Sequence, residues 1–328
     1  MKKLNHIKTL FLTIIFITIN LNLMASSHIQ KSSVTSIEKE LKIALILWRG
    51  ETKAEIGFKQ KLKDLGYKVK YTTYDAQNKR FEFPTILRKV KFENFDYIYT
   101  FGTSASQMTK HLLNNKVPQI FNIVSSPQET NIVKYMNATG GNISGVSNKV
   151  SLEVQIQTAL QIIKFKRLAL FFNPREANSM IIRSKLILLG QKYQFEVVSL
   201  RSPTLTMLQS NLDQLVKKQL KVDAVYLPAD SFIVSNAKLI GQELRAAKLK
   251  SIAAIKEYVE YGALIGTVVD YSNLGKMAAM ILHDHQNGTK LENIPVQMQK
   301  KPSIVLNKTT CDLLDVKIDQ KIMFQTFK

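Results

Sequence analysis

The sequence predicts an α/β protein of two lobes, each built on a doubly wound parallel sheet. Nearly continuous apolar runs, such as residues 42–48 and 167–172, have the pattern of strands that are buried on both faces. Segments with helical spacing of apolar residues alternate with these runs along the chain. The length of 328 residues also exceeds the usual size of one core, which favours two domains.

The first predicted lobe alternates four strands with helices. The helix after the first strand ends at Gly66, where glycine is typical of a helix terminus. The apolar residues of that helix are spaced to form one buried side: Ala54, Ile56, Phe58, Leu62 and Leu65. The predicted strands are 42–48, 69–73, 96–101 and 119–124, and the other helices are 83–90 and 106–114.

A segment at 139–146 that is rich in glycine and asparagine separates the two halves, because these residues tolerate unusual backbone dihedrals. The alternation of strands and helices then starts again. The predicted helices are 151–163, 178–193, 204–219 and 234–247, and the predicted strands are 167–172, 195–200, 224–227 and 251–255.

Ligands of such sheets bind outside the carboxyl ends of the strands. In this chain the strand ends carry these residues: Trp48, Gly102–Ser104, Ser125–Ser126, Asn173, Asp230 and Lys256. Two α/β domains that are joined near 140–148 and face each other at these edges would enclose one cleft.

The run around Gly102 is the clearest local signal for a ligand. A β-rich stretch stops at this glycine, and Thr103, Ser104 and Ser106 open a helix. A helix N-terminus presents unpaired N–H groups and a partial positive charge, so it can hold an anion. No Gly-Lys-Ser/Thr follows, which excludes a nucleotide P-loop. The alternative is an ordinary turn with a Ser/Thr cap.

The first residues have the pattern of a targeting segment. Lysines at the start precede an apolar stretch at 10–19, and Ala25-Ser26-Ser27 offers a cleavage site. We therefore expect a signal peptide at 1–27, cleaved near Ser27, and a flexible lead at 28–41. No cysteine lies near this site, so no lipid-modified N-terminus is expected. An uncleaved membrane anchor is the alternative.

Charge and composition exclude several function classes. The formal net charge is +21, but the lysines are spread evenly and do not alternate with aromatic residues, so no nucleic-acid partner is expected. The single cysteine, Cys311, excludes an intrachain disulfide and is expected to fill a C-terminal helix. His283 and His285 lie two apart on a predicted helix and point apart, so no metal site is expected. No nucleophile–base motif suggests an enzyme, and no cofactor is expected.

Several segments together carry a resemblance to a known family. They are Val117–Phe121, Val124–Pro127, Gly140–Ser147, Tyr261–Leu264, Val269–Gly275, Ile294–Val296 and Ile304–Asn307. Their order and spacing resemble the ABC-transporter substrate-binding family related to tryptophan/tyrosine-type binding proteins, over about 42–318.

This resemblance implies a type I periplasmic-binding-protein fold, whose two lobes are linked by three crossings and close on a small ligand. The first lobe would hold 42–146 plus 270–294, and the second 147–269 plus 295–328. The expected hinge segments lie at the approach formed by 140–142, near 266–269 and near Pro295.

The resemblance also implies which residues bind the ligand. The turn Gly102-Thr103-Ser104-Ala105 would meet a ligand carboxylate, with a second contact from Ser125 and Ser126. Asp230 matches the family's Pro-x-Asp position and would meet an ammonium group. Asp270 is a second carboxylate candidate, and its alternative role is to cap the helix that begins near Ser272.

Two departures from the family pattern bear on the identity of the ligand. Ser126-Pro127 stands where the family commonly has Asp-Pro, and Trp48-Arg49 stands where many members have His-Pro. Trp48 could stack on a ligand ring, and Arg49 could clamp a carboxylate. The alternatives are a packed Trp48 and a solvated Arg–Glu pair.

From these observations we expect an exported, monomeric solute receptor that captures a small carboxylate-bearing ligand, with an aromatic amino acid as first candidate. It would deliver the ligand to an ABC permease with its ATPase, and would dock at the membrane surface without spanning it. The alternative is a ligand-sensing input protein for a membrane-bound kinase or receptor.

Overall fold

The computed structural model describes residues 40–114, 116–317 and 324–327. The predicted signal peptide lies outside the described residues, as does nearly all of the predicted lead. Residues Glu40–Lys328 form one compact unit. Leu41, the last position of the predicted lead, already belongs to the first strand and is buried.

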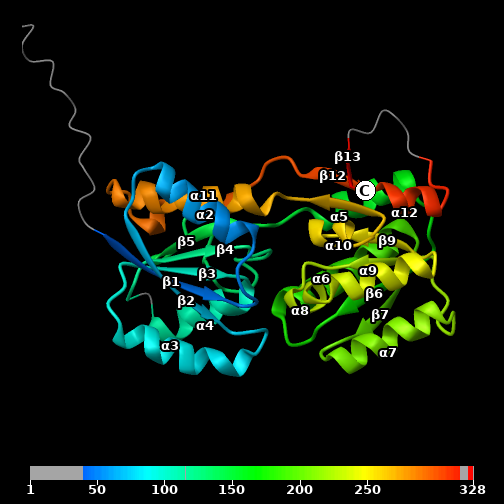
Figure 1. Ribbon diagram of the computed structural model, residues 1–328, viewed down its shortest axis with the longest axis horizontal. Helices are drawn as coiled ribbons and strands as arrows, with labels where there is room; N and C mark the ends of the chain where they lie inside the picture. The colour runs from blue at the N-terminus through cyan, green and yellow to red at the C-terminus, as the bar shows by residue number, and fades with distance from the viewer. Residues whose placement is uncertain (1–39, 115, 318–323, 328) are drawn as a thin grey trace, which may run out of the picture. The chain divides into compact units, whose positions relative to one another are not determined.

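The first lobe is organised around a six-stranded sheet in the order β11-β5-β4-β3-β1-β2, and all its neighbouring strands are parallel (Figure 1). The strands are β1 (Leu41–Leu47), β2 (Val69–Asp75), β3 (Tyr97–Phe101), β4 (Gln119–Asn122), β5 (Ile143–Ser147) and β11 (Gln297–Met298). The central strand β3 is buried along its whole length, whereas the edge strand β2 is half-exposed. Continuous apolar runs therefore mark the middle of the sheet, as predicted.

Two helices pack closely against each other on one face of this sheet, α2 (Lys53–Asp64) and α11 (Tyr271–Gln286) (Figure 1). A Cβ atom on Gly57 would lie 2.2 Å from the carbonyl oxygen of Ser272, and one on Gly275 would lie 1.9 Å from that of Ala54. This close approach corrects the predicted buried side of α2. Ile56 is 61% exposed, because the glycine side of the helix faces α11.

The opposite face of the first sheet is covered by α3 (Phe83–Phe92) and α4 (Thr103–Leu113) (Figure 1). Short 3-10 helices, η1 (Arg80–Glu82) and η2 (Leu291–Asn293), lie in the connections. Helix α4 begins at Thr103, three residues before the predicted start. The cause is Gly102, whose φ of 86° turns the chain directly from β3 into the helix.

The second lobe contains a seven-stranded sheet in the order β13-β12-β10-β9-β8-β6-β7. Strands β10 and β12 are antiparallel, and the other neighbours are parallel. The strands are β6 (Arg167–Phe172), β7 (Glu196–Arg201), β8 (Ala224–Leu227), β9 (Lys250–Ala253), β10 (Ile265–Val268), β12 (Ser303–Asn307) and β13 (Gln325–Phe327).

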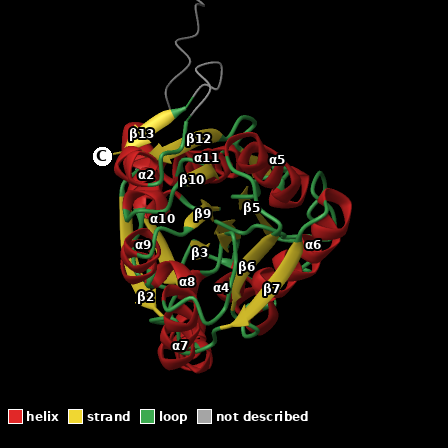
Figure 2. Cartoon of the chain, turned by 90° about the vertical axis from the view of Figure 1, so that its right-hand side faces the viewer, coloured by secondary structure: helices red, strands yellow, loops and turns green. Residues whose placement is uncertain are grey.

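Helices cover both faces of the second sheet. Figure 2 shows α5 (Leu152–Ile162) and α6 (Ala177–Tyr193) on one side of its strands, and α9 (Ala237–Ala246) and α10 (Lys256–Glu260) on the other. Helix α7 (Leu205–Val216) contacts α9. Helix α12 (Lys308–Leu313) places Cys311 in the core beside α5 and α6, which confirms the predicted role of this cysteine.

The predicted helix 234–247 is two helices, α8 (Ser231–Ser235) and α9, which meet at Asn236. The Asn236 side-chain amide donates to the carbonyl oxygen of Phe232 (2.9 Å), a carbonyl that the next helical turn would otherwise use. Lys256 is also not a strand-end residue, because it begins α10.

The described chain crosses between the lobes three times, at 148–151, 269–270 and 299–302. The third crossing lies beyond the predicted position near Pro295. The residues before it are held in the first lobe, because Ser144 Oγ donates to the carbonyl oxygen of Ile294 (2.8 Å) and β11 pairs with β5. No helix in the described ranges is long and apolar enough to span a bilayer.

Candidate functional site

Two adjoining cavities lie at the carboxyl ends of the strands, with walls from both lobes. We call them the Asp230 cavity, with an empty volume of about 310 Å³, and the Tyr226 cavity, with about 530 Å³. They share Ser125, Asn148 and Ala229, so together they form one continuous candidate site.

Both lobes and the first crossing contribute to the Asp230 cavity. Its lining residues are Arg49, Phe101, Gly102, Thr103, Ile123, Ser125, Asn148, Asn178, Ala229, Asp230, Ser231, Val234, Ile255 and Tyr271.

The two carboxylate oxygens of Asp230 have different surroundings. It is fully buried at the N-cap of α8, where Oδ1 accepts the N–H of Ile233 (2.8 Å). Oδ2 is buried and makes no hydrogen bond of normal geometry to a described residue, although the Ser179 hydroxyl and the Phe232 N–H lie close to this carboxylate. Burial, with the charge of nearby Glu176, raises the pKa of Asp230 well above its usual range. A buried carboxylate oxygen without a partner is costly, which points to a cationic group that is supplied from outside the chain.

Glu176 is the second buried carboxylate beside this cavity. It occupies the N-cap position of α6 but does not cap that helix. Instead its Oε2 and Oε1 accept the N–H groups of Ser231 and Phe232, each at 3.1 Å, at the start of α8. Burial raises the pKa of Glu176, and these two N–H donors and the nearby Trp48 oppose that rise.

Four buried polar atoms without hydrogen-bond partners in the described structure belong to residues that line the Asp230 cavity. They are Arg49 Nε, Asn148 Oδ1, Asn178 Oδ1 and Asp230 Oδ2. Buried polar atoms in native proteins are nearly always paired. Their gathering around one cavity therefore indicates a polar ligand with both donors and acceptors.

Arg49 supplies the positive charge of this cavity. Its guanidinium lies over the ring of Phe101, 5.4 Å from the centroid, and its Nη2 lies 3.5 Å from Glu257 Oε1 of the other lobe. The side chain is only 13% exposed, and Glu51 pairs with Lys59 instead. The alternative of a solvated Arg49–Glu51 pair is therefore wrong.

Trp48 takes the packed alternative. Its ring stacks on Phe83 with centroids 5.5 Å apart, it is 4% exposed, and it lines neither cavity. The indole lies near Glu176, yet Nε1 makes no hydrogen bond of normal geometry within the described chain.

The turn at Gly102 brings the first turn of α4 to the Asp230 cavity. Gly102 and Thr103 line it, and Gly102 has no side chain with which to cap the helix. Ser104 and Ala105 are buried in the same turn without lining either cavity. The N–H groups of this first helical turn can donate to an anionic group.

The loop after β4 reaches the cavity through a strained residue. Ile123 has a φ of 56°, which is unusual for a β-branched side chain, and its N–H donates to Asn122 Oδ1 (2.9 Å). Ser125 follows and lines both cavities, and Ser126 lines the Tyr226 cavity. Such strain is typical of functional sites, where the surrounding structure holds it in place.

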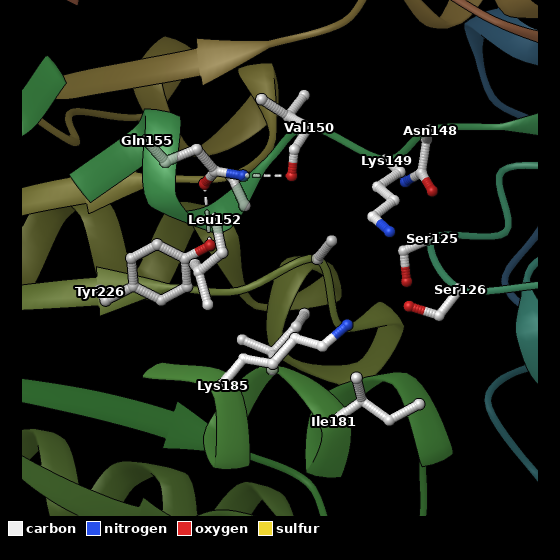
Figure 3. Close-up of a pocket in the computed structure, with 13 residues that line it drawn as sticks. Ser125, Ser126, Asn148, Lys149, Val150, Leu152, Gln155, Ile181, Lys185 and Tyr226 are labelled. Carbon is white, nitrogen blue, oxygen red and sulfur yellow. Dashed lines mark hydrogen bonds between the residues drawn. The ribbon is translucent and has the colours of Figure 1, made fainter. Parts of the chain in front are cut away.

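The Tyr226 cavity combines apolar walls with two lysines (Figure 3). Tyr226 Oη donates to Gln155 Oε1 (2.8 Å), and Gln155 Nε2 donates to the carbonyl oxygen of Val150 (3.3 Å). Figure 3 shows Lys149 and Lys185 with their ends near Ser125 and Ser126. The apolar lining consists of Val150, Leu152, Ile181, Ile182, Ala229 and Ala254.

Two predicted ligand residues have structural partners outside the cavities. Asp270 is exposed, and its Oδ1 accepts the N–H groups of Ser272 (2.8 Å) and Asn273 (3.4 Å), so it takes the alternative role as the cap of α11. The Asn173 side chain accepts the N–H of Arg175 (3.0 Å) in the turn after β6. Neither residue lines the two cavities.

A family model described as "ABC transporter substrate binding protein" matches residues 43–328. The chain belongs to this family. Its members are solute-binding proteins of ABC systems rather than enzymes.

The substrate-binding protein is similar to proteins of known identity or structure. It is 29% identical, over 269 residues, to a "Tyrosine-binding protein" of Clostridioides difficile, covering 80% of this chain and 77% of the relative. Its fold matches an ABC domain in complex with L-Trp from Streptococcus pneumoniae (TM-score 0.82, 21% identity, 88% and 100% coverage). It also matches the ligand-free, open structure of a substrate-binding protein with adhesive properties from Clostridium difficile (TM-score 0.67, 23% identity, 88% and 99% coverage). Both solved structures share its type I periplasmic-binding-protein fold.

Several residues of the candidate site have no signal in the sequence. Glu176 and Asn178 follow an ordinary turn, Asn148 lies in the first crossing, and Tyr271 begins a helix. Their shared property is the cavity to which the fold brings them. The one usable signal is that Asn148 lies at the end of the region 140–148, where the two domains are predicted to join.

Proposed function

We propose that this protein is the extracytoplasmic receptor of an ABC importer and binds a free amino acid, with tyrosine and tryptophan as first candidates. One observation carries the proposal. The Asp230 cavity brings together an unpartnered carboxylate oxygen, Asp230 Oδ2, and an unpartnered guanidinium nitrogen, Arg49 Nε. A zwitterion offers one group of each charge to such a pair.

The two ends of the zwitterion have different partners. The ammonium group binds Asp230 Oδ2, with the amide oxygens of Asn148 and Asn178 as further acceptors. The carboxylate binds the Arg49 guanidinium and the N–H groups at the start of α4, beside Thr103. Charge-assisted hydrogen bonds of this kind are the strong ones in a buried site.

The side chain of the amino acid occupies the Tyr226 cavity, which joins the Asp230 cavity at Ser125, Asn148 and Ala229. Its walls are largely apolar, and Tyr226 is among the residues that line it. An aromatic side chain suits this space. The relative named for tyrosine and the solved L-Trp complex support the same ligand class.

Binding couples to lobe closure. Side chains from the two lobes already contact each other near the site, since Asn78 Nδ2 donates to Ser235 Oγ (3.2 Å) and Lys53 Nζ donates to Glu260 Oε1 (3.1 Å). A ligand that touches both lobes favours the closed state by its difference in affinity. The closed, loaded receptor then delivers its ligand to a membrane permease that a separate ATPase drives.

A thermal-shift screen of ligand-stripped protein against the standard amino acids tests this proposal. We expect tyrosine or tryptophan to raise the melting temperature in a concentration-dependent way, because a ligand that binds only the folded state stabilises it. Stabilisation by sugars or polyols, with no response to any amino acid, would contradict the proposal.

A further inference from the structure

Glu176 is a buried carboxylate that neither touches the proposed ligand position nor caps its own helix. It is 2% exposed, and both its oxygens are committed to backbone N–H groups at the start of α8. Asp230, the residue before those donors, is the N-cap of the same helix. The two carboxylates therefore share the N–H groups of one short helix.

Which carboxylate accepts each of these N–H groups determines whether Asp230 Oδ2 is available to a ligand. Ser231 and Phe232 donate to Glu176, and Ile233 donates to Asp230 Oδ1. With all three donors satisfied, Oδ2 of Asp230 remains without a partner. In the absence of Glu176 the two orphaned N–H groups would need another acceptor, and Oδ2 of Asp230, at the N-cap of the same helix, is an uncommitted buried oxygen.

We propose that Glu176 is a positioning residue: it holds the start of α8 so that Oδ2 of Asp230 stays free for the ammonium group of the ligand. This inference rests on the proposed function and deepens it, because it makes recognition of an amine depend on a residue that does not line the cavities. Selectivity for amine-bearing ligands then arises from a pair of carboxylates of which only one binds.

The charges around Asp230 support this division of roles. The charged and titratable groups near it are Glu176 at the start of α6, Arg49 after β1, Glu257 and Tyr258 on α10, and Tyr271 on α11. Glu176 supplies the negative charge that opposes ionisation of Asp230. A bound ammonium group would relieve that repulsion, so binding should weaken in acid as Asp230 takes up a proton.

The test compares Glu176→Gln with wild type, using L-tyrosine and 3-(4-hydroxyphenyl)propionate, which lacks only the amine. We expect Glu176→Gln to weaken L-tyrosine binding by about tenfold or more and binding of the amine-free analogue by less than about twofold. We also expect the acid midpoint of L-tyrosine binding to move to lower pH, because the neighbouring charge is gone. If the glutamine variant does not fold, Glu176→Asp keeps the charge on a shorter arm; it should show the same selective loss of L-tyrosine affinity without the shift of the acid midpoint.

Glu153→Gln is the matched control, because Glu153 is an exposed carboxylate that bonds Lys192 and Tyr193 away from the cavities. It should leave both affinities and the acid midpoint as in wild type. Equal losses for the two ligands, or an unchanged acid midpoint, would overturn the role of Glu176 and indicate a merely structural carboxylate. If wild type binds neither ligand, the proposed function itself fails, which is a different result.

Discussion

The ammonium nitrogen of Lys185 lies 2.6 and 2.8 Å from the two carboxylate oxygens of Glu129, and the two residues come from opposite lobes. Lys185 lies on α6 and lines the Tyr226 cavity, and Glu129 lies in the loop after β4. The ion pair therefore joins the lobes at the edge of the candidate site. Each partner is about two-fifths exposed, so solvent weakens the interaction.

This inter-lobe ion pair should slow ligand release. We predict that Lys185→Met raises the dissociation rate of the bound amino acid by about two- to fivefold, in line with the roughly 0.2–1 kcal/mol of an exposed pair. Stopped-flow measurement of Trp48 fluorescence would follow release. Lys192→Met removes a comparable pair within the second lobe and should have no effect. The double variant Lys185→Glu/Glu129→Lys reverses the ion pair and should restore the wild-type dissociation rate. A dissociation rate that stays high in the double variant would contradict a role of this ion pair in ligand release.

The glycine contact between α2 and α11 should be essential for stability. A Cβ at Gly275 would meet the carbonyl of Ala54 at 1.9 Å, a backbone atom that cannot move aside. We predict that Gly275→Ala lowers the free energy of unfolding by about 2–4 kcal/mol, measured by urea denaturation. Gly66→Ala, where a Cβ meets nothing within 4 Å, should cost only about 1 kcal/mol of backbone strain. Equal losses would contradict the steric explanation.

Arg49 should recognise the carboxylate end of the ligand. We predict that Arg49→Met weakens L-tyrosine binding by about 10- to 100-fold, because a charge-assisted hydrogen bond is lost, but leaves binding of tyramine, which has no carboxylate, unchanged. Titration calorimetry would measure both affinities. Arg183→Met is a matched control, because Arg183 lies over Phe172 in a similar ring contact but outside both cavities. A parallel loss for tyramine would assign Arg49 to packing.

The buried carboxylates should also give the ligand-free protein an unusual pH dependence. The pKa values of Asp230 and Glu176 are raised in the folded state, so the folded state keeps protons that the unfolded state has lost above about pH 4. Stability should therefore fall as the pH rises from about 4 through the folded-state pKa values. Asp230→Asn should flatten this fall, as measured by urea unfolding between about pH 4 and 8.

Asp223 provides the opposite sign in the same molecule. The N–H groups of Lys166 and Arg167 donate to it and lower its pKa. The stability that it contributes should be present above the unfolded pKa and lost as the pH falls. If Asp230→Asn and Asp223→Asn changed the pH profile in the same direction, the assignment of the Asp230 shift would be wrong.

Most of the fold could be predicted from the sequence, because parallel strands buried on both faces leave continuous apolar runs. The segment at 167–172 is such a case and forms β6 as predicted. The errors lie where tertiary contacts override a local pattern. Ile56 fits the apolar spacing of α2 but is exposed, because a close helix contact needs the glycine side. The placement of β11 depends on pairing with β5, which no local pattern encodes.

The candidate site could be predicted only in part. Thr103 and Asp230 follow strands, where parallel sheets present ligand groups, and both line the Asp230 cavity. Glu176 could not be found, because its importance comes from N–H donors more than fifty residues away in the chain. Asp270, like Asp230, caps a helix through Oδ1, but it is exposed and lines neither cavity. Which of the two carboxylates is buried at the cavity is decided by packing.

The role of Asp230 as the ammonium site is tested by calorimetric titration of wild type and Asp230→Asn with L-tyrosine and with its amine-free analogue, 3-(4-hydroxyphenyl)propionate. Asparagine keeps the size and the helix-capping oxygen of the side chain but removes its charge. We predict that wild type prefers L-tyrosine, and that Asp230→Asn loses this preference while its affinity for the analogue is retained. An unchanged preference for L-tyrosine in Asp230→Asn would contradict the assignment of Asp230 Oδ2 as the ammonium site.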